Sequence, residues 1–167
     1  MPQGQPGETE RADDIGGRIQ RVDLETGEWT DLYLECDGNQ LRGPNDIVFD
    51  AAGGFWFTDP GRAHARTQDF GGVYWARLDG TEIREVLFPA TACNGIALSA
   101  DGKTLYVAGM PGARQVSAYE VTGPGEVAHE TNWNEFGRAR TGRRPRARLI
   151  ASLGGDRGFD SMRIDGQ

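Results

Sequence analysis

Three side chains that carry an oxygen occupy equivalent places in a repeated sequence pattern. Asn45 begins the segment 45–50, Asn94 begins the similar segment 94–99 after an offset of 49 residues, and Asp160 begins the segment 160–165 a further 66 residues on. Amide and carboxylate oxygens without Cys or His are hard ligands, which suit calcium first, and magnesium or manganese where a site is smaller. If the repeats are related by rotation about one axis, these oxygens surround one point and predict a divalent cation there.

The same residues also have an interpretation without a metal. Asn followed by Asp or Gly is a common turn dipeptide, because Asn tolerates the left-handed backbone and caps its own turn. The shared register of Asn45, Asn94 and Asp160 favours the cation site, and Asp46 is a candidate for orienting Asn45 from beside it. Only Asp160 adds a formal negative charge, so a further carboxylate is expected from a repeat that this sequence does not include.

Short strands, rather than helices, must position these residues. No stretch of twelve residues holds a clean 3.6-residue apolar period, whereas many runs of four to six are rich in β-branched and aromatic residues. Gly makes up 25 of the 167 residues, about twice the usual share, which indicates many tight turns and an antiparallel all-β chain. The expected strands are Arg18–Val22, Ile47–Phe49, Phe55–Thr58, Gly72–Leu78, Ile96–Leu98, Thr104–Ala108 and Val116–Val121.

A second repeated element groups these strands in units of four. Segments 17–23, 72–79 and 115–121 each precede a Gly-containing turn, which gives the four-strand unit of a β-propeller blade. At ~45 residues a blade, the chain holds about three to four blades and is expected to be a fragment of a closed ring. An open sandwich of similar strand content is the alternative. The expected organisation is a disordered tail over 1–15 and a partial β-propeller over 16–167.

Charge and composition narrow the range of partners. The chain carries 18 Lys and Arg against 25 Asp and Glu, and a net charge of −7 gives no general attraction to nucleic acid or anionic membranes. No window reaches the ~18 apolar residues of a membrane span, and the polar first fourteen residues do not resemble a signal sequence. Cys36 and Cys93 are too few for a disulfide scaffold, and buried reduced thiols indicate a cytoplasmic location.

Other reactive or charged residues have plainer interpretations. His64 lies on a loop that could overhang a channel mouth but is expected to be solvated, and His129 is expected at the surface. The Arg-rich stretch 138–148 is expected to be a solvated loop between strands, because it belongs to no nucleic-acid module. The tryptophans are expected to fill space between blades, and they are Trp29, Trp56, Trp75 and Trp133. No Gly-x-Ser-x-Gly elbow supports a Ser-His-Asp triad.

Four motifs follow one another along the chain. The first is GPNDIVFD over 43–50 with GGFWFTD over 53–59, and the second is FGGVY over 70–74. The third is NGIALS over 94–99 with DGKTLYVA over 101–108, and the last is FDSMRID over 159–165. Together they resemble the SMP-30/gluconolactonase/LRE-like family, from about Gly16 to the last residue.

This resemblance implies a six-bladed propeller that holds a divalent cation in its channel, usually calcium, with magnesium, manganese or zinc as substitutes. Matched one at a time, the family's cation ligands fall on Asn45, Asn94 and Asp160, whereas its Glu ligand has no counterpart in this sequence. The implied activity is hydrolysis of a small-molecule lactone, in which the cation polarises the carbonyl, water attacks, and Asp160 is the candidate general base. A non-catalytic propeller that binds a protein or small ligand, and an inactive truncated fragment, are the alternatives.

Overall fold

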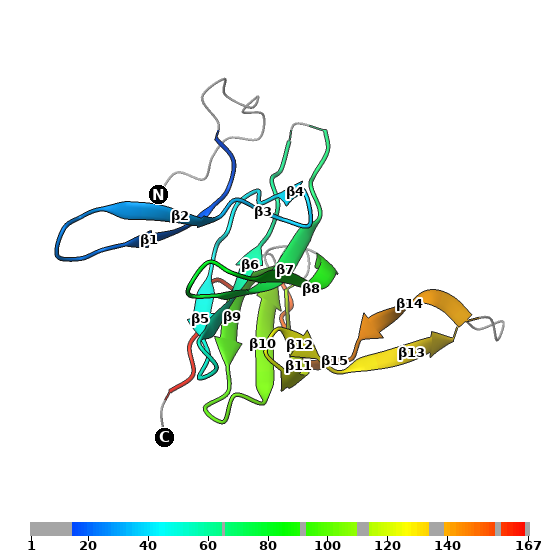
Figure 1. Ribbon diagram of the computed structural model, residues 1–167. Helices are drawn as coiled ribbons and strands as arrows, with labels where there is room; N and C mark the ends of the chain where they lie inside the picture. Colours follow the sequence, from blue (N-terminus) through cyan, green and yellow to red (C-terminus); the bar gives the residue numbers. More distant parts are fainter. Residues whose placement is uncertain are drawn as a thin grey trace.

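The computed structural model describes residues 15–64, 66–90, 93–109, 114–133, 139–155 and 158–165, and its regular structure there is entirely β-strand (Figure 1). Within these ranges there is no helix that could span a membrane. The strands are β1 (Ile19–Val22), β2 (Trp29–Tyr33), β3 (Glu35–Cys36), β4 (Asn39–Gln40), β5 (Ile47–Phe49), β6 (Gly54–Asp59), β7 (Gly71–Arg77), β8 (Ile83–Ala90), β9 (Cys93–Leu98), β10 (Thr104–Gly109), β11 (Gln115–Gly123), β12 (Glu126–Val127), β13 (His129–Trp133), β14 (Ala139–Pro145) and β15 (Ala147–Ser152).

The β5–β8 sheet is a four-stranded antiparallel unit, as the repeat predicts. Its strands lie in the order β5-β6-β7-β8, which is also their order in the sequence. β6 pairs with β7 so that Trp56 lies opposite Trp75 and Phe57 opposite Tyr74. All six residues of β6 are buried, because this strand is covered on both faces. The run of apolar residues at 54–58 is the sequence signal for such a strand.

The second sheet has the order β12-β11-β10-β9, and β15 also pairs with β11. The Arg-rich stretch was expected to be a solvated loop, and this is wrong for its described part, since Ala139–Pro145 is β14 and Ala147–Ser152 is β15. β15 forms because β11 presents unpaired backbone groups at its edge, while the charged side chain of Arg148 stays exposed to water. Arg138 and the expected tail over 1–14 lie outside the described residues.

Two apolar clusters hold the body together, one on each face of the β5–β8 sheet. Side chains alternate along β6, so Trp56 points toward the second sheet while Phe55 and Phe57 point the opposite way. The first cluster consists of Trp56, Val73, Trp75, Leu87, Cys93, Ile96, Leu105, Val107 and Val127. The second consists of Tyr33, Cys36, Leu41, Phe55, Phe57, Tyr74 and Ala76. Both cysteines are therefore buried free thiols, as expected.

Three of the four tryptophans divide between the core and the surface, and the side chain of Trp133 lies outside the described part of the structure. Trp56 and Trp75 fill the space between the two sheets as expected, each about 1% exposed or less. Trp29 does not, because it lies at the start of β2 opposite Val22, in the hairpin that extends away from the body (Figure 1), and it is 61% exposed. Trp29 stands between Glu28 and Thr30, whereas the buried Trp56 stands between Phe55 and Phe57, so polar neighbours were a local sign of its exposure.

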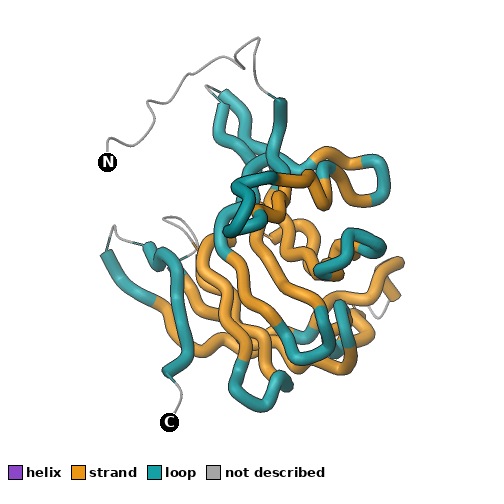
Figure 2. The backbone as a smooth tube through the Cα atoms, turned by 60° about the vertical axis from the view of Figure 1, so that its left-hand side comes forward, coloured by secondary structure: helices purple, strands orange, loops and turns teal. Residues whose placement is uncertain are grey.

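The segment 158–165 lies alongside β5 and β9 (Figures 1 and 2). The sequence predicts that Asp160 opens the first strand of a further blade, but the described residues here form no strand. The backbone of Phe159 bonds to the end of β10, where Phe159 N donates to Gly109 O over 3.2 Å, and to a side chain of β9. A strand needs a neighbouring strand as a ladder partner, and this segment has side-chain partners instead.

Candidate functional site

Two of the predicted ligands are joined through Thr58, a fully buried residue of β6. Asn45 lies two residues before Ile47, the first residue of β5, and its backbone N donates to Thr58 O over 2.8 Å. Asn94 is the second residue of β9, and its carbonyl oxygen accepts the Thr58 hydroxyl at 2.5 Å. The Asn94-Gly95 dipeptide is thus part of a strand, so its interpretation as a turn is wrong. The interaction between the sheets brings the two asparagines to one end of β6.

Asn94 also meets the third predicted ligand. Its Nδ2 donates to Asp160 Oδ1 over 3.2 Å and to Phe159 O over 3.1 Å. Asn94 is 6% exposed, and its Oδ1 is buried without a hydrogen-bond partner. Leaving such an acceptor unsatisfied costs about 1–3 kcal/mol. A hard cation bonds to amide and carboxylate oxygens, so the unpaired Oδ1 of an Asn94 side chain that contacts Asp160 fits one.

The charge of the site is low, as the sequence indicates. Asn45 and Asp160 are both exposed, so their oxygens are open to solvent and to a ligand. Among the described residues, no three His, Cys, Asp or Glu side chains form a group that could hold a metal. Any cation between Asn45, Asn94 and Asp160 would therefore depend on amide oxygens and one carboxylate.

Asp46 links all three segments that carry the predicted ligands. It is 5% exposed, and its Oδ1 accepts the backbone N of Ile47 while its Oδ2 accepts that of Ile96, both at 3.0 Å. Arg163 Nη1 lies 3.1 Å from Oδ1 and 3.2 Å from Oδ2. The sequence predicted Asp46 as a partner that orients Asn45, and the contacts that its carboxylate makes run to Ile47 of β5, to β9 and to the segment 158–165.

Gly95 allows the segment 158–165 to approach β9. A Cβ atom on Gly95 would collide with the backbone oxygen of Asp160 and press on Met162. The glycine is thus required by a close approach of two backbones, rather than by a turn. Sequence reasoning missed this role, as it missed the roles of Thr58 and Arg163, because each depends on a partner far away in the chain.

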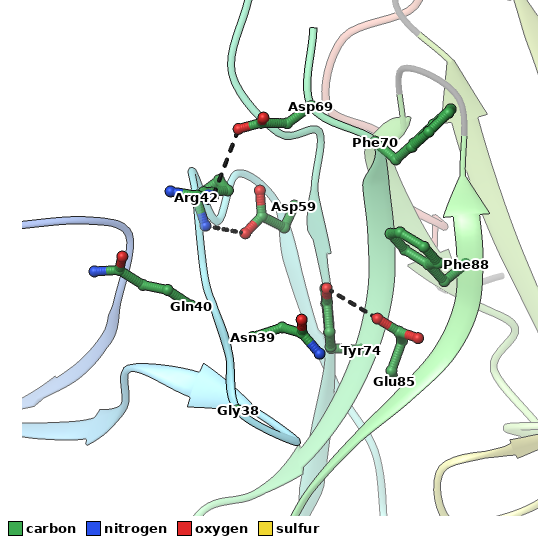
Figure 3. A pocket seen from close by; sticks show the side chains of 10 residues that line it. All are labelled: Gly38, Asn39, Gln40, Arg42, Asp59, Asp69, Phe70, Tyr74, Glu85 and Phe88. Atoms are coloured by element: carbon green, nitrogen blue, oxygen red, sulfur yellow. Dashed lines mark hydrogen bonds and ion pairs between the residues drawn. The ribbon is translucent and has the colours of Figure 1, made fainter. Parts of the chain in front are cut away.

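A cavity of about 450 Å³ opens beside β7 and β8 (Figure 3), but none of the predicted ligands lines it. Phe70 and Phe88 meet edge to face at one side of this cavity, and Tyr74 OH donates to Glu85 at 3.5 Å. Burial raises the pKa values of both Tyr74 and Glu85. The residues that line the cavity are Gly38, Asn39, Gln40, Arg42, Asp59, Asp69, Phe70, Tyr74, Glu85 and Phe88.

Two aspartates at the cavity, Asp59 and Asp69, bind residues of the neighbouring loops through their carboxylates. Asp59 is 3% exposed and accepts the backbone N–H groups of Arg42, Gly43 and Gly61, which fixes the chain before β5. His64 lies on a loop, as expected, but this loop joins β6 to β7 within the β5–β8 sheet rather than leaving it, and His64 Nε2 is 3.5 Å from Asp69 Oδ1. His64 is thus partly buried beside a carboxylate rather than fully solvated. His129 is exposed in β13, as expected.

The chain matches a protein family over most of its length and is similar to known lactonases over a shorter part. A family model described as SMP-30/Gluconolactonase/LRE-like region matches residues 14–167. Lactonase drp35 of Staphylococcus epidermidis is 44% identical over 63 residues, which are 38% of this chain and 19% of that protein. The Staphylococcus aureus lactonase drp35 is 43% identical over the same share of each chain.

A solved gluconolactonase from Xanthomonas campestris is similar over 89% of this chain and 46% of its own, with 25% identity and a TM-score of 0.63. This similarity shows that the β5–β8 sheet and the β12-β11-β10-β9 sheet are blades of a β-propeller, as the sequence predicts. None of the described sheets closes on itself. The chain therefore spans less than half the length of the relatives and the solved structure that it matches.

Proposed function

Because the chain belongs to the SMP-30/gluconolactonase/LRE-like family, we propose that it serves in the hydrolysis of a small lactone with a divalent cation, calcium first, held by Asn45, Asn94 and Asp160. The observation that carries this proposal is the buried Asn94 Oδ1, which has no hydrogen-bond partner, on a side chain whose Nδ2 donates to the Asp160 carboxylate. The lactonases and the gluconolactonase that resemble this chain support a lactone as the substrate class.

The chain's own residues would act on the lactone and on the attacking water. A bound divalent cation would polarise the lactone carbonyl and stabilise the charge that develops on its oxygen. The N–H groups of Asn94 and Ser161 both donate to Asp160 Oδ1, which fixes the direction of that carboxylate. Asp160 is exposed, so it can accept a proton from the water that attacks the carbonyl carbon. Asn45 and Asn94 would supply neutral amide oxygens, which can bind a cation without first losing a proton.

The two cysteines support a cytoplasmic location, which we also propose. Cys36 and Cys93 are both buried and unpaired. Free thiols in a folded core persist most readily in a reducing compartment.

Calorimetric titration of calcium chloride into the chelator-treated chain, with thermal unfolding of the same samples, tests the cation site. We expect binding at one site and a rise in melting temperature, because a ligand at 100 times its Kd adds about 2.7 kcal/mol to the free energy of unfolding. Gluconolactone hydrolysis, followed by proton release with and without calcium, tests the activity.

The control is Asn39→Ala, which removes an exposed amide of β4 and should leave calcium binding unchanged. Absence of both heat and thermal shift at millimolar calcium would contradict the cation site. Ligand binding by a chain that binds no calcium would instead favour the non-catalytic alternative.

A further inference from the structure

Arg163 makes an ion pair with a carboxylate 117 positions away in the chain. The partner, Asp46, is 5% exposed, whereas the Arg163 side chain is 65% exposed. The guanidinium therefore reaches inward from the surface to the two oxygens of a buried group, at 3.1 and 3.2 Å. Arg163 Nη1 also donates to the carbonyl oxygen of Met162, which bends the side chain back over its own segment.

This ion pair completes a closed set of links among three segments. Asp46 binds β9 through Ile96 N, and Asn94 on β9 binds the segment 158–165 through Phe159 O and Asp160 Oδ1. Arg163 then binds that segment back to Asp46, at the start of β5. Each segment that carries a predicted cation ligand is thus tied to both of the others.

The hydrogen bonds of Asp46 and its ion pair with Arg163 hold different parts of the structure. Asp46 keeps two backbone N–H donors, from Ile47 and Ile96, whether or not Arg163 is present. The contact of β5 with β9 therefore does not depend on the arginine. The segment 158–165 forms no strand in the described structure, so its position rests on few hydrogen bonds, and Arg163 supplies its charged one.

We propose that Arg163 is a positioning residue for the cation site, which acts through Asp46 to hold Asp160 against Asn94; this rests on the proposed function. Asp160 lies three positions before Arg163, and Gly95 packs against the backbone between them. With Asp160 bonded to Asn94 Nδ2 and Arg163 paired with Asp46, the Asp160 carboxylate stays against the Asn94 side chain before any cation binds. The arginine thereby lowers the conformational entropy that cation binding would otherwise have to remove.

The test compares Arg163→Ala with Arg163→Lys, and with Arg18→Ala as a matched control. Arg18 pairs with Asp31 at 3.1 Å in the β1–β2 hairpin, so its removal breaks a similar ion pair that touches none of the predicted ligands. Hydrogen exchange of the metal-free chain reports on the peptide 158–165, and calorimetry reports the calcium Kd. Both measurements are made well below the melting temperature, so that only folded protein contributes.

We expect Arg163→Ala to speed exchange in 158–165 without changing β6 and β7, and to weaken calcium binding about ten-fold, as loss of a group that orients metal ligands typically does. Arg163→Lys, which keeps a charge for Asp46, should restore most of the affinity. In an Asp46→Asn background, Arg163→Ala should cause little further loss, because the two residues act as one unit.

Equal exchange in Arg163→Ala and the parent chain would overturn the proposal, as would an Arg18→Ala effect of the same size on calcium binding. The exchange measurement needs no cation. If the parent chain binds no calcium, the proposed function fails, while the exchange data still decide whether Arg163 holds the segment.

Discussion

At the scale of single residues, the two ends of the Asn94 side chain have different environments. Nδ2 is used twice, toward Phe159 O and Asp160 Oδ1, while Oδ1 is buried with no hydrogen-bond partner. Buried acceptors are nearly always paired in folded proteins, so one that is not is a candidate for function. Asp160, which contacts Asn94 Nδ2, supplies the charge of the proposed set, and Asn45 supplies its third oxygen.

Replacing these oxygens tests the assignment directly. Asn94→Ala and Asp160→Ala should each weaken calcium binding by at least about ten-fold, because each removes a proposed ligand rather than a group behind one. His64→Ala, whose imidazole pairs with Asp69 instead, should leave the Kd unchanged. The measurement is calorimetric titration of the three variants side by side, and equal affinity in all three would refute the site.

At the scale of elements, Thr58 connects β6 to β9, which carries Asn94, and to Asp46, which lies between Asn45 and β5. Its hydroxyl accepts the backbone N of Asp46 at 3.2 Å and donates to Asn94 O. Thr58 is fully buried, so no water can replace either bond from the solvent side. The end of β6 thereby fixes the relative height of Asn45 and Asn94.

A change that keeps the shape of Thr58 but removes its hydroxyl should reveal this link. Thr58→Val leaves a buried N–H and a buried C=O without this partner, which should lower the free energy of unfolding by about 1–3 kcal/mol. Thr58→Ser removes the methyl group but keeps the hydroxyl. Its calcium Kd should therefore stay near that of the parent chain, even if the missing methyl lowers the free energy of unfolding. Urea unfolding measures the stability, and a Val variant as stable as the parent would contradict the role of the bond.

At the scale of the whole molecule, the interface between the two sheets includes a buried thiol. Cys93 is 2% exposed at the start of β9, and it belongs to the cluster that joins both sheets. Its Sγ lies 3.2 Å from Gly72 O and 3.4 Å from Asp59 O. Burial, with a smaller effect of the Asp59 charge, raises the pKa of Cys93 from 9.0 to about 12.

This shift predicts a loss of stability in alkali. The folded chain keeps the Cys93 proton that the unfolded chain releases above its pKa of 9.0, so the contribution is fully present below pH 9 and is lost as the pH rises toward about 12. Urea midpoints from pH 8 to pH 10.5 measure it. In Cys93→Ala the decline should be shallower, and an identical slope in both proteins would exclude the thiol as its source.

The sequence by itself determined the strands β5 to β7 and β9 to β11, while the register that it predicts for Asn45, Asn94 and Asp160 stays a prediction. These strands follow from the types and spacing of neighbouring residues, since β-branched and aromatic runs between Gly-rich turns specify strands locally. The four motifs, read in order, were also enough to indicate the family and the propeller fold, which the comparisons show.

Only the tertiary structure decided which partners those elements meet. It gave β15 a place on β11 and set Asn94-Gly95 within a strand instead of a turn. It also paired Arg163 with Asp46, two residues whose local sequences carry no sign of each other. The physical reason is that such contacts depend on where whole strands lie, and that position is fixed by packing summed over residues far apart in the chain.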